Sequence, residues 1–468
     1  MHLRMKTLSV CTLAALGLLA CGKEEPKPAP PPPPAAAPAP PPPPPVLTVK
    51  IGHAAPLTGP QAHLGKDNEN GARMAIDDAN EKGMELGGTK VKFELMGEDD
   101  QADPKTGTTV AQKLIDAKVN GIVGHLNSGT TIPASKLYME AGIPEISPSA
   151  TNPTYTEQGF KTAFRVMSND VQQGKALGEY AVKNLKKKSI AIIDDRSAYG
   201  QGLADQFQKA AVASGAKIVT HEYTSDKETD FAAILTKVKS KKPDLVFYGG
   251  MDAQAGPMAK QLKTLGIKAP MLFGDGGCTT EFHKLAGDAA AGNYCSLPGV
   301  PLEKMPGGAD FKARYKTKFN TDIQLYAPYA YDAAMVMIDA MKRANSADPA
   351  KYLAELAKTT DYSGVTAKIS FDDKGDVKDG AVTLYQAKDG QWMPLETVGG
   401  APMAQAVEGA KEAVKEAAAE VKDAAKDAAK ATGDMVKEGV KSAAEAVKSG
   451  AEAVKSGAEA AKSAVEKK

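Results

Sequence analysis

The sequence predicts an α/β protein whose parallel sheets carry helices on both faces, preceded by a proline-rich linker and followed by a helical tail. Short runs rich in Val, Ile and Phe alternate with longer amphipathic runs from residue 47 to about residue 398, which is typical of parallel sheets. The chain of 468 residues is too long for one hydrophobic core, so we expect two domains. The segments outside this region differ from it in composition.

Residues 1–20 have the build of a secretory signal peptide. Basic Arg4 and Lys6 precede an apolar stretch that is too short to span a bilayer permanently. Leu18-Leu19-Ala20-Cys21 resembles a bacterial lipobox, in which Cys21 would become the lipidated first residue of an exported protein. We therefore expect a periplasmic or other extracytoplasmic lipoprotein that touches the membrane only through its anchor. An ordinary cleaved signal with a chance cysteine is the alternative.

Residues 21–45 form the predicted linker. Fourteen of the positions between 26 and 45 are proline, which removes backbone donors and fixes φ. Such a segment favours an extended polyproline II spacer that rises ~3.1 Å per residue. It would hold the following domain away from the lipid anchor.

The globular region divides into alternating elements. The predicted strands are Val46–Ala54, Val91–Met96, Gly121–Gly124, Ser189–Asp194, Lys217–Tyr223, Asp244–Gly249 and Ala269–Gly274. The predicted helices lie near residues 66–82, 105–118, 170–186, 200–214, 229–240 and 253–265. Ligands of such folds bind beyond the carboxyl ends of the strands, next to helix N-termini.

The tail, residues 401–468, consists largely of Ala, Lys, Glu and Val. Heptad spacing places Val440, Val447 and Val454 on one line, and recurring Glu–Lys pairs at i, i+3 favour a helix. The stripe of small residues is too thin for a strong coiled coil. We expect a marginal helix that becomes firmer on a surface or a partner; a flexible helical tail without a specific role is equally consistent.

Charge and motifs exclude several function classes. A net charge of +1 gives no reason to expect nucleic acid as a partner. The six histidines are scattered, and no motif for nucleophilic catalysis, phosphate binding or metal binding is present. Asp372–Asp376 is acidic but lacks the spacing of a calcium loop, so we expect a turn. We therefore expect neither an enzyme, nor a cofactor, nor a metal.

Two cysteines remain after processing. Cys11 leaves with the signal peptide and Cys21 carries lipid, which leaves Cys278 and Cys295 in an oxidising compartment. A disulfide between them would contribute roughly 3 kcal/mol. Two buried free thiols are the alternative.

Polar clusters follow three of the strands. In Gly124–Thr131 a strand leads into a helix; the free N–H groups and the Ser128 hydroxyl suit a carboxylate, although Ser128 or Thr130 would also serve as an ordinary helix cap. Ile146–Pro153 is rich in hydroxyls, with a plain turn as the alternative. Asp275 stands among glycines. Its carboxylate would face a ligand cation, with an ordinary Asx turn as the alternative. Together the clusters offer both counter-charges that a buried α-amino acid needs.

At this point the chain resembles the Leu/Ile/Val-binding protein family, the periplasmic receptors of branched-chain amino acid ABC transporters. The resemblance covers about residues 47–390. Its motifs are Pro56–Pro60, Asp99–Pro104, Gly124–Ser128, Ser147–Thr151, Tyr199–Gly202, Phe247–Gly250 and Phe371–Asp376.

The family fold, a type I periplasmic binding protein, implies two doubly wound lobes that are joined by three crossovers and close on the ligand by a hinge motion. The first lobe would comprise residues 46–168 with about 298–375, and the second residues 169–297 with about 376–398.

The resemblance also implies roles for single residues. The Ser128 and Thr151 hydroxyls would hold the ligand carboxylate, while the Ser149 carbonyl and the Asp275 carboxylate would hold the ammonium. The remaining pocket residues would be Tyr199 from the second lobe, Asn127, and the side-chain pocket of Leu64, Leu126, Met251 and Tyr326.

Several positions depart from the family pattern. The family commonly has an aromatic residue in place of Leu64, a Tyr in place of Met251 and a Glu in place of Asp275. Its best-known members have a cysteine where Asn127 stands. These changes make the pocket softer and leave the size of the preferred apolar side chain open.

We therefore expect a lipid-anchored solute-binding protein that captures an apolar, branched-chain amino acid and delivers it to an ABC permease in the inner membrane. A sensor of the same fold for an amide or another small organic acid is the alternative. Asp275 separates the two, because an acid without an amine gives this carboxylate no partner.

Overall fold

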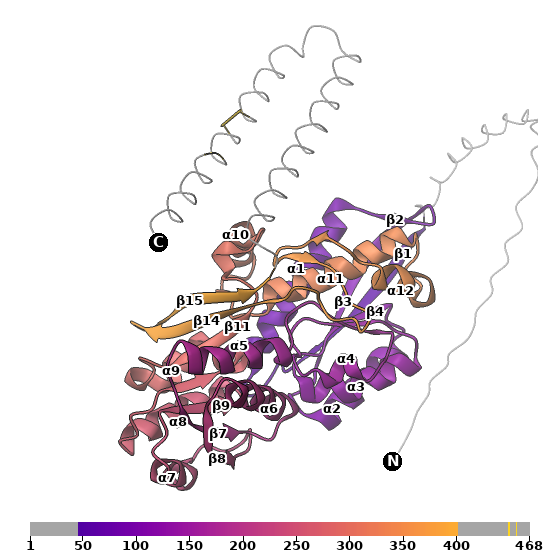
Figure 1. The fold of residues 1–468 in the computed structure, drawn as a ribbon. Coiled ribbons are helices and arrows are strands. Elements are labelled where there is room, and N and C mark those ends of the chain that lie inside the picture. Colours follow the sequence, from indigo (N-terminus) through magenta and orange to yellow (C-terminus); the bar gives the residue numbers. More distant parts are fainter. Residues whose placement is uncertain (1–44, 401–447, 450–454, 456–468) are drawn as a thin grey trace, which may run out of the picture. The chain divides into compact units, whose positions relative to one another are not determined.

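The computed structural model describes residues 45–400 and the isolated positions 448, 449 and 455. The predicted signal peptide, the lipidated Cys21 and nearly all of the linker and the tail lie outside these residues. Among the described residues, no helix combines the length and the apolar character that crossing a bilayer requires. The strands form two large sheets and a small one (Figure 1).

The first sheet has six strands and is parallel except at one edge, where β2 runs antiparallel to β3. Its core strands are short runs of Val, Ile and Gly that are buried on both faces, as expected for a covered parallel sheet. In spatial order the strands are β2 (Glu85–Leu86), β3 (Thr89–Asp99), β1 (Val46–Ala55), β4 (Gly121–Gly124), β5 (Glu145–Ser147) and β6 (Ala163–Arg165).

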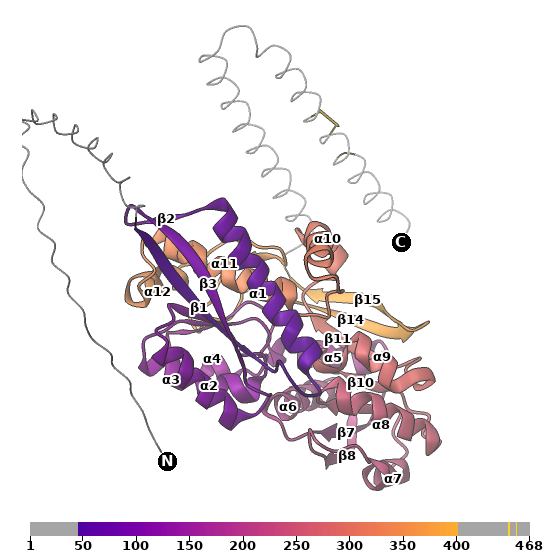
Figure 2. The same cartoon turned by 180° about the vertical axis from the view of Figure 1, so that it is seen from behind.

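Helices cover both faces of this sheet. α1 and α11 pack together on one face, and α2 and α3 pack on the other; in Figure 2, α1 crosses in front of β1 and β3. The helices of this part are α1 (Ala62–Lys82), α2 (Pro104–Asp116), α3 (Ser128–Glu140), α4 (Thr154–Glu157), α10 (Gly308–Phe319), α11 (Ala327–Arg343) and α12 (Pro349–Ala357). The sheet and these helices form the first lobe, together with the hairpin of β12 (Tyr362–Ser363) and β13 (Lys368–Ile369).

The second sheet has seven strands, of which the last two in sequence run antiparallel to their neighbours. In spatial order they are β15 (Gln391–Gly399), β14 (Ala381–Lys388), β11 (Tyr294–Pro298), β10 (Met271–Phe273), β9 (Leu245–Gly249), β7 (Ser189–Asp194) and β8 (Lys217–Tyr223). α5 and α6 cover one face, and α7, α8 and α9 cover the other. These helices are α5 (Asp170–Lys183), α6 (Ala198–Ala213), α7 (Ala232–Ser240), α8 (Asp252–Thr264) and α9 (Thr280–Ala286). Sheet and helices form the second lobe.

The chain passes between the lobes three times: after β6, after β11, and before β14. A buried hub ties the first of these passages to the third. The guanidinium of Arg165 donates from Nε and Nη2 to Asp376 Oδ1, at 2.9 and 2.6 Å. Its Nη1 donates to the carbonyls of Ala150 and Asn152, at 2.8 and 2.9 Å. Asp376 Oδ2 accepts from Asn169 at 3.0 Å, so the expected turn at Asp372–Asp376 also holds two of these passages together.

Local sequence explains where the helices begin. Asn169 accepts from the N–H groups of Val171 and Gln172, and the Gln172 side chain returns to the Asn169 N–H, which is a capping box at the start of α5. Asp103 caps α2, which has Pro104 at its first position. These caps fix where α2 and α5 begin.

Cys278 and Cys295 form a disulfide bond. Cys278 directly follows the 3-10 turn η1 (Asp275–Gly277), and Cys295 lies in β11. The Cys278 N–H also donates to the carbonyl of Asp275 at 2.9 Å. The bond therefore holds the turn that carries Asp275 against the sheet.

The predicted parallel sheets are confirmed, and each of the two large sheets has antiparallel strands at an edge. β2, β14 and β15 are antiparallel, and the hairpin of β14 and β15 turns at Asp389 and Gly390, whose φ values are 51° and 74°. An Asp-Gly pair with positive φ at both positions suits the right-handed twist of a two-residue hairpin.

Candidate functional site

A pocket with about 210 Å³ of empty space lies between the lobes. Most of its residues directly follow the carboxyl ends of β4, β5, β9 and β10, where ligands of open α/β sheets bind. Eight of the ten predicted ligand residues line it: Leu126, Asn127, Ser128, Ser149, Tyr199, Met251, Asp275 and Tyr326.

The other two predicted residues, Leu64 and Thr151, are not among the lining residues. Leu64 is fully buried in the main hydrophobic core. Thr151 is also fully buried; its carbonyl accepts from the Asp170 N–H at 2.8 Å, and its hydroxyl has no hydrogen-bond partner among the described residues. Their predicted ligand contacts stay predictions.

Ser128 begins α3 and does not act as a cap. Its hydroxyl accepts from the N–H of Asn152 at 3.2 Å, while the Thr130 and Thr131 hydroxyls donate to the Asn127 carbonyl. In the described structure no side chain caps the α3 N-terminus, so the alternative of an ordinary cap at Ser128 or Thr130 is wrong. An uncapped helix start attracts an anion through its N–H groups and its dipole.

Asp275 lines the pocket from the second lobe and is 1% exposed. Its Oδ1 accepts from the Tyr199 hydroxyl at 2.9 Å, and its Oδ2 accepts from the Tyr326 hydroxyl at 2.7 Å. Burial raises the pKa of Asp275 above its ordinary value, against the opposing effect of the two tyrosine hydroxyls. Because Tyr326 belongs to the first lobe and Tyr199 to the second, both lobes converge on this carboxylate.

Asp170 is a second buried carboxylate, close enough to Asp275 to interact with its charge, and sequence reasoning missed it. Burial raises its pKa to about 8, and the negative charge of Asp275 adds to the shift. Neither oxygen has a hydrogen-bond partner among the described residues. An aspartate at the start of α5 looks like ordinary helix-start chemistry, so the sequence carries no signal for it.

The pocket therefore offers complementary surroundings to two opposite charges. Two buried carboxylates of the second lobe, both with raised pKa values, favour a cation, because an added positive charge offsets their desolvation. The Ser128 hydroxyl and the start of α3 in the first lobe favour an anion. Leu126 and Met251 supply apolar surface. Within the described part of the chain, no group of three or more His, Cys, Asp or Glu side chains is arranged to hold a metal.

An ion pair links the lobes beside the pocket. His63 Nε2 of α1 lies 2.8 Å from Asp252 Oδ2 of α8, and Asp252 also accepts from the Thr279 hydroxyl. Burial lowers the pKa of His63, but Asp252, with a smaller contribution from Glu281, outweighs it and leaves the pKa raised. Asp252 directly follows the pocket residue Met251.

This ion pair gives a testable dependence on pH. The pKa of His63 is raised on folding, so its stabilisation is fully present below the unfolded value of about 6.5 and is lost as the pH rises through the folded value. Urea unfolding of the wild type and of His63→Gln should differ by on the order of 0.5–1 kcal/mol at about pH 5.5, and by less at about pH 9. A difference that is equal at both pH values would contradict the role of the charge.

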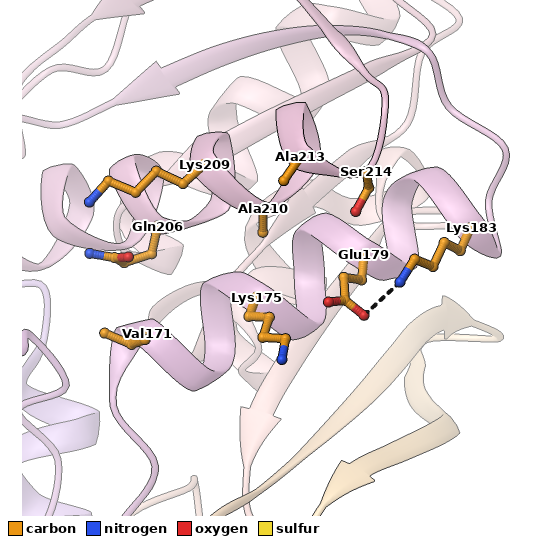
Figure 3. A pocket seen from close by; sticks show the side chains of 9 residues that line it. All are labelled: Val171, Lys175, Glu179, Lys183, Gln206, Lys209, Ala210, Ala213 and Ser214. Atoms are coloured by element: carbon orange, nitrogen blue, oxygen red, sulfur yellow. Dashed lines mark hydrogen bonds and ion pairs between the residues drawn. The ribbon is translucent and has the colours of Figure 1, made fainter.

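A larger hollow lies on the outer surface of the second lobe, between α5 and α6 (Figure 3). It has about 790 Å³ of empty space and contains none of the predicted site residues. Figure 3 shows side chains of both helices around it, with the Lys183–Glu179 ion pair at one end. Its lining residues are Val171, Lys175, Glu179, Lys183, Gln206, Lys209, Ala210, Ala213 and Ser214.

Comparison with known proteins places the fold and the site in context. A family model described as "Periplasmic binding protein" matches residues 48–391. The Leu/Ile/Val-binding protein homolog 1 of Brucella abortus is 37% identical over 342 residues, which cover 73% of this chain and 91% of that protein. The leucine-, isoleucine-, valine-, threonine- and alanine-binding protein of Pseudomonas aeruginosa is 33% identical over 339 residues, which cover 72% and 90%.

Among solved structures, the chain is similar to the branched-chain amino acid transporter substrate binding protein LivJ of Streptococcus pneumoniae, determined in complex with isoleucine. The TM-score is 0.69 at 29% identity, with 75% of this chain and 99% of that chain covered. The similarity therefore spans both lobes.

Proposed function

The chain belongs to the periplasmic binding protein family, and from this premise we propose that it captures an apolar amino acid outside the cytoplasm and delivers it to an ABC transporter. The buried Asp275 carboxylate carries the proposal. It lines the pocket and accepts from two tyrosine hydroxyls, and Ser128 at the uncapped start of α3 lines the same pocket. The relatives are named as binding proteins for leucine, isoleucine and valine, which supports an apolar amino acid as the ligand of this chain.

The charges of a zwitterion fit this arrangement. A buried ammonium needs a paired carboxylate, and a buried carboxylate needs donors; otherwise desolvation defeats binding. In our proposal Asp275 and the Ser149 carbonyl hold the ammonium, and Asp170 adds negative charge nearby. The Ser128 and Thr151 hydroxyls hold the carboxylate. Binding stabilises the closed arrangement because the two lobes each hold part of the ligand.

The apolar part of the pocket favours a group of ligands over a single one. Leu126 and Met251 line it, and a flexible methionine adapts to side chains of different shape. One methylene group in such a pocket is worth only ~1–3 kcal/mol of discrimination. We therefore infer a preference for leucine, isoleucine and valine as a group.

Delivery and location complete the proposal. The lipid on Cys21 and the proline-rich linker would keep the two lobes near the membrane, within reach of a permease. The hinge would be the three passages between lobes, with residues 46–168 and about 298–375 moving against residues 169–297 and about 376–398.

Calorimetric titration tests the proposed function. The protein, unfolded and refolded to remove bound ligand, is titrated with each of the twenty amino acids and with 4-methylpentanoic acid, the amine-free analogue of leucine. We expect leucine, isoleucine and valine to bind with affinities that lie within about 200-fold of one another, and the amine-free acid to bind at least tenfold more weakly than leucine. Binding of the amine-free acid without binding of any amino acid would contradict the proposal and favour a receptor for organic acids.

A further inference from the structure

Asp67 of α1 holds the segment that carries Tyr326. The buried carboxylate, 2% exposed, accepts four backbone N–H groups in a row. Oδ1 accepts from Gln324 at 2.9 Å, and Oδ2 accepts from Leu325, Tyr326 and Ala327 at 2.9, 2.7 and 2.9 Å. The Tyr315 hydroxyl donates to Oδ1 at 3.0 Å. Five donors on one carboxylate leave the segment little freedom.

This carboxylate takes the place of a helix cap. Tyr326 is the N-cap of α11, and its own side chain makes no capping hydrogen bond, because its hydroxyl reaches Asp275 Oδ2 at 2.7 Å. A negative charge at a helix N-terminus is favourable, and here a neighbouring helix supplies it. Gly71, one turn further along α1, permits the close approach: a Cβ there would lie 2.1 Å from the Ala327 carbonyl oxygen.

Asn68, the next residue of α1, reaches a second lining residue. Its Nδ2 donates to the Ser149 hydroxyl at 3.0 Å, and both side chains are buried. The backbone next to Ser149 is held by a separate contact, because Ser147 Oγ accepts from the Ala150 N–H at 2.9 Å. Asn68 therefore sets the orientation of the Ser149 side chain beside the pocket.

We propose that Asp67 and Asn68 are positioning residues of the ligand pocket: Asp67 aims Tyr326 at Asp275, and Asn68 holds Ser149. Neither lines the pocket, so both act through another residue. The inference rests on the proposed function, because it concerns the end of the pocket that would receive the ligand ammonium.

Asp67→Asn tests the first half, with Asp78→Asn as a matched control. Asp78 lies on the same helix and also ties it to neighbouring helices, since its Oδ2 accepts from the Tyr331 hydroxyl and from Arg314, but it is not a lining residue. We expect Asp67→Asn to weaken leucine binding about tenfold and to reduce the preference for leucine over 4-methylpentanoic acid. Asp78→Asn should change neither quantity by more than about twofold.

A binding cycle with Tyr326→Phe separates positioning from general loosening. Without the Tyr326 hydroxyl, Asp67→Asn should cost less than about threefold in leucine affinity, because the contact that it aims is already absent. A loss that is equal in both backgrounds would overturn the positioning role of Asp67.

Asn68→Leu tests the role of Asn68 in holding Ser149, with Asn80→Leu as a matched control. Asn80 is on the same helix and pairs with the backbone of Phe93 through both side-chain atoms. We expect weaker leucine binding in Asn68→Leu and unchanged binding in Asn80→Leu. If Asp67→Asn does not fold, this comparison still shows whether α1 positions the lining residues of the pocket. Wild-type protein that binds no amino acid would contradict the proposed function, whereas variants at Asp67 and Asn68 that bind as well as their controls would overturn only this inference.

Discussion

Replacing Asp275 with asparagine should weaken leucine binding by at least about 30-fold while leaving the protein as stable as before. The loss follows because removing one partner of a buried charge pair costs about 2–5 kcal/mol of affinity. The fold should not suffer. Burial disfavours the charge of Asp275 and raises its pKa, so an uncharged amide loses little there. The amide oxygen accepts from one tyrosine hydroxyl, and the amide N–H group donates to the oxygen of the other. Calorimetry gives the affinity and urea unfolding gives the stability.

Asp332→Asn is the matched control for this prediction. Asp332 is also fully buried, and burial raises its pKa to about 6. It accepts from the N–H groups of Val365 and Thr366 and lies outside the pocket lining. The same substitution should therefore lower stability and leave leucine affinity within about twofold. Loss of stability without loss of affinity in Asp275→Asn would place Asp275 in the structure only and remove it from the ammonium site.

Replacing Arg165 with methionine should destabilise the protein by about 3–5 kcal/mol. The guanidinium is fully buried and makes contacts with Asp376, Thr156 and two backbone carbonyls. Its removal leaves the Asp376 charge without its cation and frees the Ala150 and Asn152 carbonyls. Because these carbonyls flank Thr151, leucine binding should weaken as well. Urea denaturation measures the change, with the slope m compared between variants to exclude a change of the unfolded state.

Two further variants sharpen this result. Arg165→Met combined with Asp376→Leu removes both charges and should recover part of the lost stability, because an unpaired buried charge costs more than an apolar replacement of the pair. Arg343→Met removes an arginine whose side chain is 32% exposed and which pairs with Asp339 and Glu355; it should cost less than about 1 kcal/mol. Equal losses at positions 165 and 343 would contradict a special role of the hub.

Sequence patterns predicted the strands and helices of the alternating region. They missed elements and contacts that depend on residues far away in the sequence. The predicted strand Ser189–Asp194 is β7, and the predicted helix near 253–265 is α8 at Asp252–Thr264, because each has a regular pattern and clear ends. α11 was not predicted, although its sequence carried usable signals: Pro328 stands near its start, and Lys342 and Arg343 lie in its last turn. The hairpin of β14 and β15 carried a usable signal, the Asp389-Gly390 pair.

The candidate site was predicted mainly through resemblance. Strand-end position alone left Ser128 between a cap and a ligand group, and only the structure shows that its hydroxyl faces Asn152 instead of its own helix. Asp67 and Asp170 look like ordinary helix residues in the sequence. Their importance comes from partners such as Tyr326, which lies 259 positions away from Asp67, and no local pattern reports such a distance.

The discontinuous first lobe has a consequence for the order in which the protein is made. One face of the first sheet, which includes Val49 and Ile51, is covered by α1 together with α11, a helix that begins at Ala327. A chain that emerges from a ribosome or a translocation channel N-terminus first therefore leaves part of that apolar face uncovered until residues 169–297 of the second lobe have been made. We expect the first lobe to acquire its stability late in synthesis, so that a nascent chain halted before Ala327 remains a substrate for chaperones and proteases.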